Sequence, residues 1–478
     1  MTAPTPGAVP ARRLMAALPP EYEGNAAAEL AQALALRDEG VVVLDDDPTG
    51  TQTVHDVTVL TETGGGALSR ALSGAPPDRP RLLYVSTNSR AFSGPDAATL
   101  ARSLGRELAE ASAALGRPVT VISRSDSTLR GHFPGETDAL ADGLGAGFDG
   151  VILCPFFAEG GRLTIGDRHW VADGEWLVPA DETEYAKDPA FGYTSRTLPA
   201  WVEEKTGGRW PAAEVASVSL QLIREGGPEA VADLLSTISG GRPVIINSAT
   251  YSDLRVAVLG MLQAESAGVR FLCRTAASFV KVRGGVADRP LLRAEEIPAG
   301  DGPGIVAAGS YVDKTSRQLG ELRRLPDLVD VELSAERAAA GGASADDESR
   351  RVAARIDEAL AAGLDALVFT SRGRVEDPGA GPRIAECLAD TLKLLATRPS
   401  FAVLKGGITS HVCVTRWLGA ARAYVLGQVI PGVAVWRIEE SRVGEGTPVV
   451  IFPGNVGGPT ALADVVSIMR GSTGKGRK

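Results

Sequence analysis

Short apolar runs alternate with helix-like segments along nearly the whole chain. A helical pattern that begins at Pro95 and ends near Leu115 follows one such run. Apolar runs of the first half lie at 41–44, 82–87, 119–124, 150–157, 243–249 and 269–274. Short apolar runs separated by helices are typical of parallel strands covered on both faces. The pattern therefore predicts an α/β fold with largely parallel sheets.

The alternation is interrupted once and then restarts. Residues 281–304 are rich in glycine, proline and charge, which is typical of a linker. A chain of 478 residues also exceeds what one hydrophobic core usually serves. We therefore predict two α/β domains. The expected division is an N-terminal extension at 1–36, a first domain at 37–285, a linker at 286–302 and a second domain at 303–475.

Two segments do not follow the alternation of strands and helices. Residues 158–215 carry four of the six tryptophans and many acidic residues, and we interpret them as an insertion or lid-like excursion on the first domain. Packing is the simpler role for those aromatic side chains, with ligand contact as the alternative. Residues 1–20 contain repeated prolines and are expected to form a mobile tail.

The composition limits the classes of partner that the protein is expected to bind. The formal charge is −10, which makes nucleic acid or an anionic membrane surface an unfavourable partner. No apolar run approaches the roughly 20 residues of a membrane span, and the first residues lack the apolar core of a signal peptide. The four cysteines contain no CxxC pair. We predict a cytoplasmic protein with reduced, buried thiols, no nucleic-acid partner and no membrane partner.

The first candidate site is the acidic end of the run "VVVLDDDPTG". Three adjacent carboxylates repel one another, so their placement favours a function. Asp45 and Asp47 fit the D-x-D-x-T motif of haloacid-dehalogenase-type phosphatases. Asp46 and Asp47 fit instead a substrate-positioning and base motif of a sugar-acid kinase. A loop of helix caps and solvated charges is the third interpretation.

The second candidate is "SRSDSTLRGHFPGE" at 123–136. Arg130 offers a planar fork for a carboxylate, and the hydroxyls of Ser127 and Thr128 could bind a polyol. A structural pair between Asp126 and Arg130 is the alternative.

Three glycine-bearing strand ends lie in the second half. They are "AAGSYVDKTSRQ" at 307–318, "VLKGGITSHV" at 403–412 and "FPGNVGG" at 452–458. Glycine lets a phosphate approach backbone N–H groups, and the start of a helix favours an anion. Each turn alone could be only a tight turn. Together they predict a nucleotide-sized cleft, although the P-loop, G-x-S-x-G and G-x-G-x-x-G motifs are all missing.

These motifs occur in an order that resembles the four-carbon acid sugar kinase family over roughly residues 38–470. The resemblance implies an N-terminal domain that binds a four-carbon acid sugar and a C-terminal domain that binds ATP. It implies a tetronate-type 4-phosphate as product, with threonate, erythronate or an oxo-tetronate as the substrate type. The carried-over residues are Asp46, Asp47 and Arg130 on the substrate side, and Ser310, Gly406, Gly407, Ile408, Thr409 and Gly454 on the nucleotide side.

Two positions depart from the family pattern, and Pro48 together with the tryptophan-rich excursion at 158–215 suggests a divergent branch. Pro48 stands in "DDPTGTQ" where many members read D-D-[FL]-T-G-A, and Ile408 replaces the acid of GG[DE]T. The departures bear on the choice of substrate more than on the reaction.

The leading prediction is therefore an ATP-dependent sugar-acid kinase. A kinase needs a carboxylate to accept the proton of the attacking alcohol, and it needs oxygen ligands for Mg²⁺. We assign the base to Asp47 and magnesium or substrate orientation to Asp46, and expect Asp45 to be solvated. ATP and Mg²⁺ are the expected cofactors. A D-x-D-x-T phosphohydrolase and a nucleotide sensor without turnover are the alternatives, and a homo-oligomer is left open.

Overall fold

The computed structural model describes residues 4–63, 66–73, 82–145, 147–309, 313–371, 377, 379–441 and 444–471. The chain packs as two compact units. Unit 1 comprises Met1–Asp46 and Thr63–Ala287, and unit 2 comprises Asp47–Glu62 and Asp288–Lys478. Both units are α/β, so the predicted fold class is confirmed.

A parallel sheet forms the centre of unit 1. Its strands, in spatial order, are β10 (Ala216–Val218), β11 (Arg242–Ile246), β6 (Gly150–Cys154), β12 (Phe271–Thr275), β5 (Val119–Arg124), β2 (Gly40–Asp45) and β4 (Leu82–Ser86). Every neighbouring pair in this order runs parallel. Burial along β2 is continuous, as expected for a strand covered on both faces.

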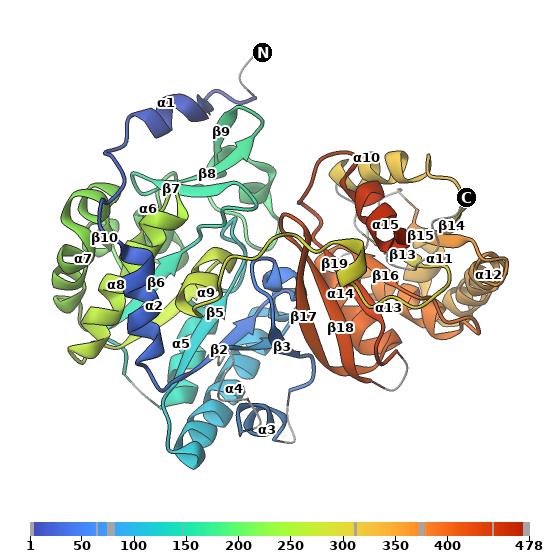
Figure 1. Ribbon diagram of the computed structural model, residues 1–478, viewed down its shortest axis with the longest axis horizontal. Coiled ribbons are helices and arrows are strands. Elements are labelled where there is room, and N and C mark those ends of the chain that lie inside the picture. The colour runs from blue at the N-terminus through green and yellow to red at the C-terminus, as the bar shows by residue number, and fades with distance from the viewer. Residues whose placement is uncertain are drawn as a thin grey trace. The chain divides into compact units, whose positions relative to one another are not determined.

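The helices of unit 1 begin and end where local chemistry predicts. In α4 the Ser93 hydroxyl accepts the Asp96 N–H, Pro95 lies in the first turn, and Gly116 ends the helix in the left-handed conformation. The helices of unit 1 are α1 (Ala11–Ala16), α2 (Ala26–Ala35), α3 (Ala67–Ser73), α4 (Gly94–Leu115), α5 (Gly135–Leu144), α6 (Leu198–Lys205), α7 (Gly227–Ser236), α8 (Tyr251–Ser266) and α9 (Ala277–Arg283). Helices α7 and α8 pack together (Figure 1).

A small antiparallel sheet accounts for much of the tryptophan-rich excursion. Its order is β1 (Val9–Pro10), β9 (Trp176–Pro179), β8 (Arg168–Asp173) and β7 (Arg162–Ile165). Because β1 pairs with β9, the expectation of a mobile tail at residues 1–20 was wrong for this stretch. Trp201 is buried and stacks on Phe133 with ring centroids 5.0 Å apart, so this aromatic has the packing role.

Unit 2 combines a parallel part with an antiparallel part. The strands, in spatial order, are β14 (Leu328–Leu333), β15 (Asp365–Thr370), β13 (Ile305–Ala308), β16 (Ala402–Lys405), β19 (Pro448–Phe452), β18 (Val433–Ser441), β17 (Ala420–Ile430) and β3 (Val57–Leu60). Strands β14 to β19 pair in parallel, and β19 to β3 pair antiparallel. Sequence analysis placed residues 47–62 in the first domain. They pack in unit 2 because β3 pairs with β17.

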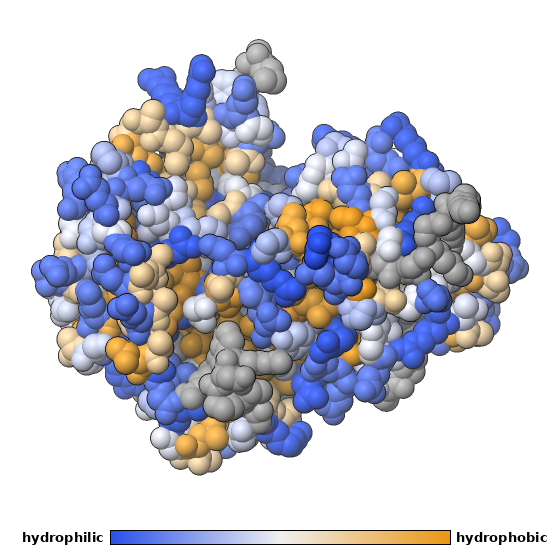
Figure 2. Space-filling model, in the orientation of Figure 1, coloured by the Kyte–Doolittle hydropathy of each residue, from blue (hydrophilic) through white to orange (hydrophobic). Residues whose placement is uncertain are grey.

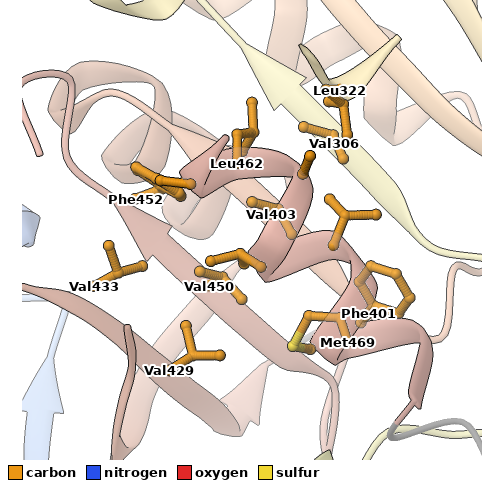
Figure 3. Packing of buried hydrophobic residues seen from close by; sticks show 14 of the residues in the cluster. Val306, Leu322, Phe401, Val403, Val429, Val433, Val450, Phe452, Leu462 and Met469 are labelled. Carbon is orange, nitrogen blue, oxygen red and sulfur yellow. The ribbon is translucent and has the colours of Figure 1, made fainter. Parts of the chain in front are cut away.

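Helices cover the sheet of unit 2 and close its core. They are α10 (Asp313–Leu322), α11 (Ala335–Ala340), α12 (Gly342–Ala361), α13 (Ala380–Lys393), α14 (Gly407–Val412) and α15 (Ala461–Gly471). Figure 3 shows Leu462 and Met469 of α15 packed over Val403 and Val450 of the strands. Leu292 belongs to the same core, so part of the predicted 286–302 linker is packed against unit 2.

The surface and the cysteines agree with the composition. On the face drawn in Figure 2, hydrophilic residues are spread over both units and are interrupted by smaller hydrophobic areas. Within the described ranges, no helix has both the length and the apolar character that crossing a bilayer requires. The four cysteines are buried and form no disulfide bonds.

Candidate active-site residues of the two units

In unit 1 the predicted polar motifs meet at one edge of the parallel sheet. Asp45 at the end of β2 pairs in register with Ser86 of β4 and with Arg124 of β5, and Arg124 is paired with Thr275 of β12. The carboxyl ends of these strands therefore coincide. In open α/β sheets this edge is where ligands bind.

The two acids of this edge are held by arginines. Asp45 is 1% exposed and its Oδ1 accepts Nη1 of Arg124 at 3.0 Å, so the expectation that Asp45 is solvated was wrong. The Asp46 carboxylate accepts two hydrogen bonds from Arg90, at 2.5 Å and 3.2 Å. Arg90 follows β4 in the short 3-10 helix Ser89–Ala91. Charge-assisted pairs of this kind fix both the position and the rotamer of Asp46.

Asp126 organises the "SDSTLRG" loop. Its Oδ2 accepts Nε of Arg130 at 2.8 Å, together with the N–H and the hydroxyl of Thr128. Burial opposes ionisation of this carboxyl, but Arg130 and Arg90 hold its pKa well below the usual range. The Arg130–Asp126 pair that the sequence left as an alternative is therefore present. Thr128 is fully buried, and Ser127 is also buried, with its carbonyl accepting Nε2 of His169. Their hydroxyls stay only predicted as substrate contacts.

The rest of the Arg130 guanidinium faces residues of the excursion. Nη1 of Arg130 lies 3.9 Å from the Asp188 carboxylate, and its Cζ lies 5.2 Å from the ring centroid of Tyr185. Arg130 therefore links the "SDSTLRG" loop to residues that follow β9.

Sequence reasoning missed three charged residues of this edge: Arg90, Glu136 and Arg274. Glu136 lies in the first turn of α5 and accepts the Ser89 hydroxyl at 2.5 Å. Burial, followed by the nearby Asp46 carboxylate, raises the pKa of Glu136 to about 7. Arg274 is a buried residue of β12. The available signal was an arginine at the carboxyl end of an apolar run, as in "VRFLCR" and "LLYVSTNSR".

In unit 2 the glycine-bearing strand ends also share one edge. Ala308 of β13 pairs with Lys405 of β16, and Lys405 pairs with Phe452 of β19. Gly309, Gly406 and Gly454 follow these strands within two residues. Ser310, which was predicted to bind the nucleotide, lies outside the described residues.

The "KGGITS" turn needs both of its glycines. Gly406 has φ +110°, which side-chain-bearing residues rarely adopt, and its N–H donates to the Phe452 carbonyl at 2.8 Å. A Cβ at Gly407 would overlap the Asp47 carboxylate. Thr409 is buried against Gly309, whereas the Ile408 side chain is 48% exposed.

Asp47 reaches this turn because the "DPTGT" segment folds as a capped 3-10 helix. Oδ1 of Asp47 accepts the Thr49 N–H at 2.8 Å, and Pro48 occupies the first position of the helix Pro48–Thr51. Thr51 is buried and accepts the indole N–H of Trp436 at 2.8 Å. The segment is therefore anchored within unit 2, with the Asp47 carboxylate beside Gly407.

In unit 2, Lys405 is a further residue that the sequence did not identify. Its side chain is fully buried, and Nζ donates to the carbonyls of Pro453 at 2.5 Å and Gly454 at 3.3 Å. Burial, and secondarily Lys314, lower the pKa of Lys405 to about 7. This lysine ties the "KGGITS" turn to the "FPGN" turn.

The sequence matches two described family domains. Residues 41–283 match a sugar-binding N-terminal domain, and residues 305–462 match a nucleotide-binding C-terminal domain. Together they cover most of the chain and define a two-domain protein of the sugar-binding and nucleotide-binding type. The chain belongs to the four-carbon acid sugar kinase family, as the motifs predicted.

Named relatives match more partially. A D-erythronate kinase of Heliobacterium modesticaldum is 30% identical over 179 residues, which is 36% of either chain. A D-threonate kinase of Bordetella bronchiseptica is 30% identical over 34% of this chain and 38% of its own. These matches span well under two thirds of the two relatives. A D-threonate kinase of Cupriavidus necator is 26% identical over 66% of this chain and 71% of its own.

Solved structures share the fold. A Salmonella typhimurium protein superposes with a TM-score of 0.64 at 17% identity, covering 89% of this chain and 98% of that one. A Haemophilus influenzae protein from a family named as a domain of unknown function gives 0.58 at 16% identity, covering 90% and 100%. At these identities the likeness concerns the fold alone.

Proposed function

We propose that this protein transfers the γ-phosphoryl group of ATP to the terminal 4-hydroxyl of a four-carbon acid sugar, either a tetronate or an oxo-tetronate. The observation that carries the proposal is the Asp47 carboxylate beside Gly407, because it brings an acid to the glycine-lined edge of the nucleotide-binding unit. The named kinase relatives support the same reaction class.

The reaction needs little covalent chemistry from the protein. A bond forms between the substrate O4 and the γ-phosphorus, the bond from that phosphorus to the leaving oxygen of ADP breaks, and the O4 proton passes to a carboxylate late in transfer. Asp47 is the proposed acceptor of that proton. Its oxygens are also of the kind that Mg²⁺ prefers, so they suit the magnesium that accompanies ATP. The glycines at 406–407 leave no side chain that would hinder a phosphate at this turn.

Unit 1 has the residue types that a small hydroxy acid requires. Arginine side chains complement a carboxylate bidentately, and carboxylates accept hydrogen bonds from hydroxyl groups. Asp46 is held rigidly by Arg90, which favours a role in orienting the substrate rather than in accepting the proton.

The test uses the purified full chain with ATP and Mg²⁺. We expect ADP release that depends on an added acid from a panel of D-threonate, D-erythronate and oxo-tetronates, with one 4-phosphorylated product by mass spectrometry and ³¹P NMR. ATP consumption that ignores every four-carbon acid would contradict the proposal. A product phosphorylated elsewhere than O4 would keep the kinase and reject the regiochemistry.

The phosphohydrolase alternative loses support from the geometry of its first aspartate. In a D-x-D-x-T enzyme the first acid attacks phosphate and must be accessible, but Asp45 is 1% exposed and bonded to Arg124. Release of inorganic phosphate from a tetronate 4-phosphate without nucleotide would restore that alternative. ATP binding without acid-dependent turnover would instead indicate a sensor. Cytoplasmic location and homo-oligomerisation stay predictions from the sequence.

A further inference from the structure

We propose that Arg274 holds the carboxylate of the acid substrate in unit 1. The inference deepens the proposed function and rests on it, because it assumes that unit 1 binds a small hydroxy acid. It also moves the anchor from Arg130, which the sequence suggested, to a residue that the sequence did not single out.

Arg274 differs from the other arginines of its edge in its partners. Arg90, Arg124 and Arg130 each pair with an aspartate at 3.0 Å or less. Among the residues that the structure describes, no carboxylate oxygen lies within 4 Å of the Arg274 guanidinium, and its one hydrogen bond runs from Nη2 to the Arg130 carbonyl at 3.3 Å.

This arrangement is costly for a buried cation. The side chain is 6% exposed, and burial lowers the pKa of Arg274 although Asp46 and Glu136 act in the opposite direction. A buried guanidinium without a directly paired carboxylate is unfavourable, because its charge has left water for incomplete compensation. A bound carboxylate would supply that compensation.

Two aromatic rings lie beside the guanidinium. Its Cζ lies 5.3 Å from the ring centroids of both Phe133 and Trp201, and these two rings stack on each other. Cation–π contacts of this kind attract the guanidinium toward the rings but do not neutralise its charge. The N–H groups at the edge of the plane are the ones that a carboxylate binds in a fork geometry.

A glycine lies close to both charged groups. Gly131 has φ +123°, and a Cβ built on it would lie 3.2 Å from Oδ2 of Asp46 and 3.3 Å from Nη2 of Arg274. A cationic donor and an anionic acceptor therefore both lie next to Gly131. A hydroxy acid carries the complementary pair, since its carboxylate suits Arg274 and its hydroxyl can donate to Asp46.

The experiment compares four variants of the full chain. Arg274→Met keeps apolar bulk against Phe133 and Trp201 but removes the fork, and Arg274→Lys keeps only a point charge. Arg130→Met tests the competing anchor. Arg168→Met is the matched control, because Arg168 also stacks on an indole, Trp170, at 5.1 Å but lies outside the proposed site.

We expect Arg274→Met to raise the KM for the acid, and its calorimetric Kd without ATP, by about ten- to a hundredfold, the loss expected for one charged hydrogen-bonded contact. Arg274→Lys should give a smaller increase, and the KM for ATP should change little in either variant. Arg168→Met should leave the KM for the acid unchanged. Thermal melting of each variant reports any general loss of structure.

The outcomes separate the inference from the proposed function. If the wild type phosphorylates a tetronate and both Arg274 variants keep its KM and Kd, the inference is overturned. The same holds if Arg130→Met alone weakens the acid. If the wild type binds a tetronate but does not phosphorylate it, the proposed function fails, and loss of that binding in Arg274→Lys still supports the anchor.

Discussion

The charged edge of unit 1 and the glycine-lined edge of unit 2 lie at equivalent positions of their sheets but consist of different types of residue. Both lie at the carboxyl ends of parallel strands. In unit 1 the strands end in arginines and aspartates that pair with one another, such as Arg124 with Asp45. In unit 2 they end in glycines, and the buried Lys405 is bonded to backbone carbonyls.

The difference teaches how one topology serves two kinds of ligand. A small hydroxy acid presents a few directional groups, so charged side chains with fixed rotamers are needed to distinguish it. A polyphosphate presents many equivalent oxygens and can be met by backbone N–H groups, provided that no Cβ blocks the approach. The strand-end residues therefore predict the ligand class of each edge better than the topology does.

The largest effect is expected at Asp47, which is the acid beside the glycine-lined edge of unit 2. Asp47→Asn should lower kcat by about 10²–10⁴, the usual range for the loss of a general base. The KM for ATP should change less than kcat, because the amide has nearly the same shape as the carboxylate and keeps one oxygen. Steady-state kinetics with the acid substrate checks this.

Asp56→Asn is the matched control for Asp47→Asn. Asp56 lies in the same 47–62 segment and bonds to His55 and Tyr424, away from Gly407. We expect near wild-type kcat in this control. Near wild-type kcat in Asp47→Asn would remove Asp47 from the chemistry and leave the glycine edge without its acid.

Gly407→Ala tests the same edge by changing the backbone position that lies against the Asp47 carboxylate. The added Cβ would overlap the Asp47 carboxylate and must displace it, because that carboxylate is also bonded to the Thr49 N–H. A displacement of the order of 1 Å can lower the rate by about a hundredfold. We expect this loss in kcat. Gly320→Ala in α10, where a Cβ would meet nothing within 4 Å, is the control, and equal kcat in the two variants would contradict the close contact.

The sequence predicted the elements and the edges well because both depend on local patterns. Apolar runs of four to eight residues indicated the strands, and polar residues directly after them indicated where the sites lie. The small β1–β9 pairing was missed, since a two-residue strand has no periodicity to detect. The packing of residues 47–62 in unit 2 was not foreseen, because their pairing with β17 joins positions more than 350 residues apart.

The roles of individual charges could not be predicted in the same way. Asp45, Asp46 and Asp47 are adjacent in sequence, yet Asp45 is bonded to Arg124, Asp46 to Arg90, and Asp47 lies beside Gly407. Only the three-dimensional partners distinguish them. Arg274 could not be singled out from the sequence either. It differs from its neighbours in having no carboxylate oxygen within 4 Å among the described residues, which only the structure shows.

Buried ionisable groups of the two edges should also affect how the free energy of unfolding depends on pH. The pKa of Lys405 is lowered from 10.5 to about 7, so the folded state binds fewer protons than the unfolded state between these values. The free energy of unfolding should therefore rise as the pH increases from about 7 toward 10.5. Lys405→Met should flatten that rise, and the exposed Lys393→Met should not. Denaturation at several pH values measures both, and an unchanged slope in Lys405→Met would show that Lys405 is not the source.

Glu136 in unit 1 should give a smaller effect of opposite sign. Its pKa is raised from 4.5 to about 7, so the folded state binds more protons than the unfolded state in this interval. The stabilising contribution is complete below 4.5 and is lost as the pH rises through about 7. Because each pKa unit is worth about 1.4 kcal/mol, the displacement of Glu136 should change stability less than that of Lys405.

Glu136→Gln tests this assignment without removing the polar side chain. The glutamine should make the free energy of unfolding less dependent on pH between 4.5 and about 7 and should raise it, relative to the wild type, at the upper end. Glu110→Gln on the exposed face of α4 is the control. A steeper decline in Glu136→Gln than in the wild type would mean that Glu136 is ionised throughout this interval. The charged edge of unit 1 would then hold its acids, including Glu136, entirely as anions, and Arg274 would have less need of a bound carboxylate.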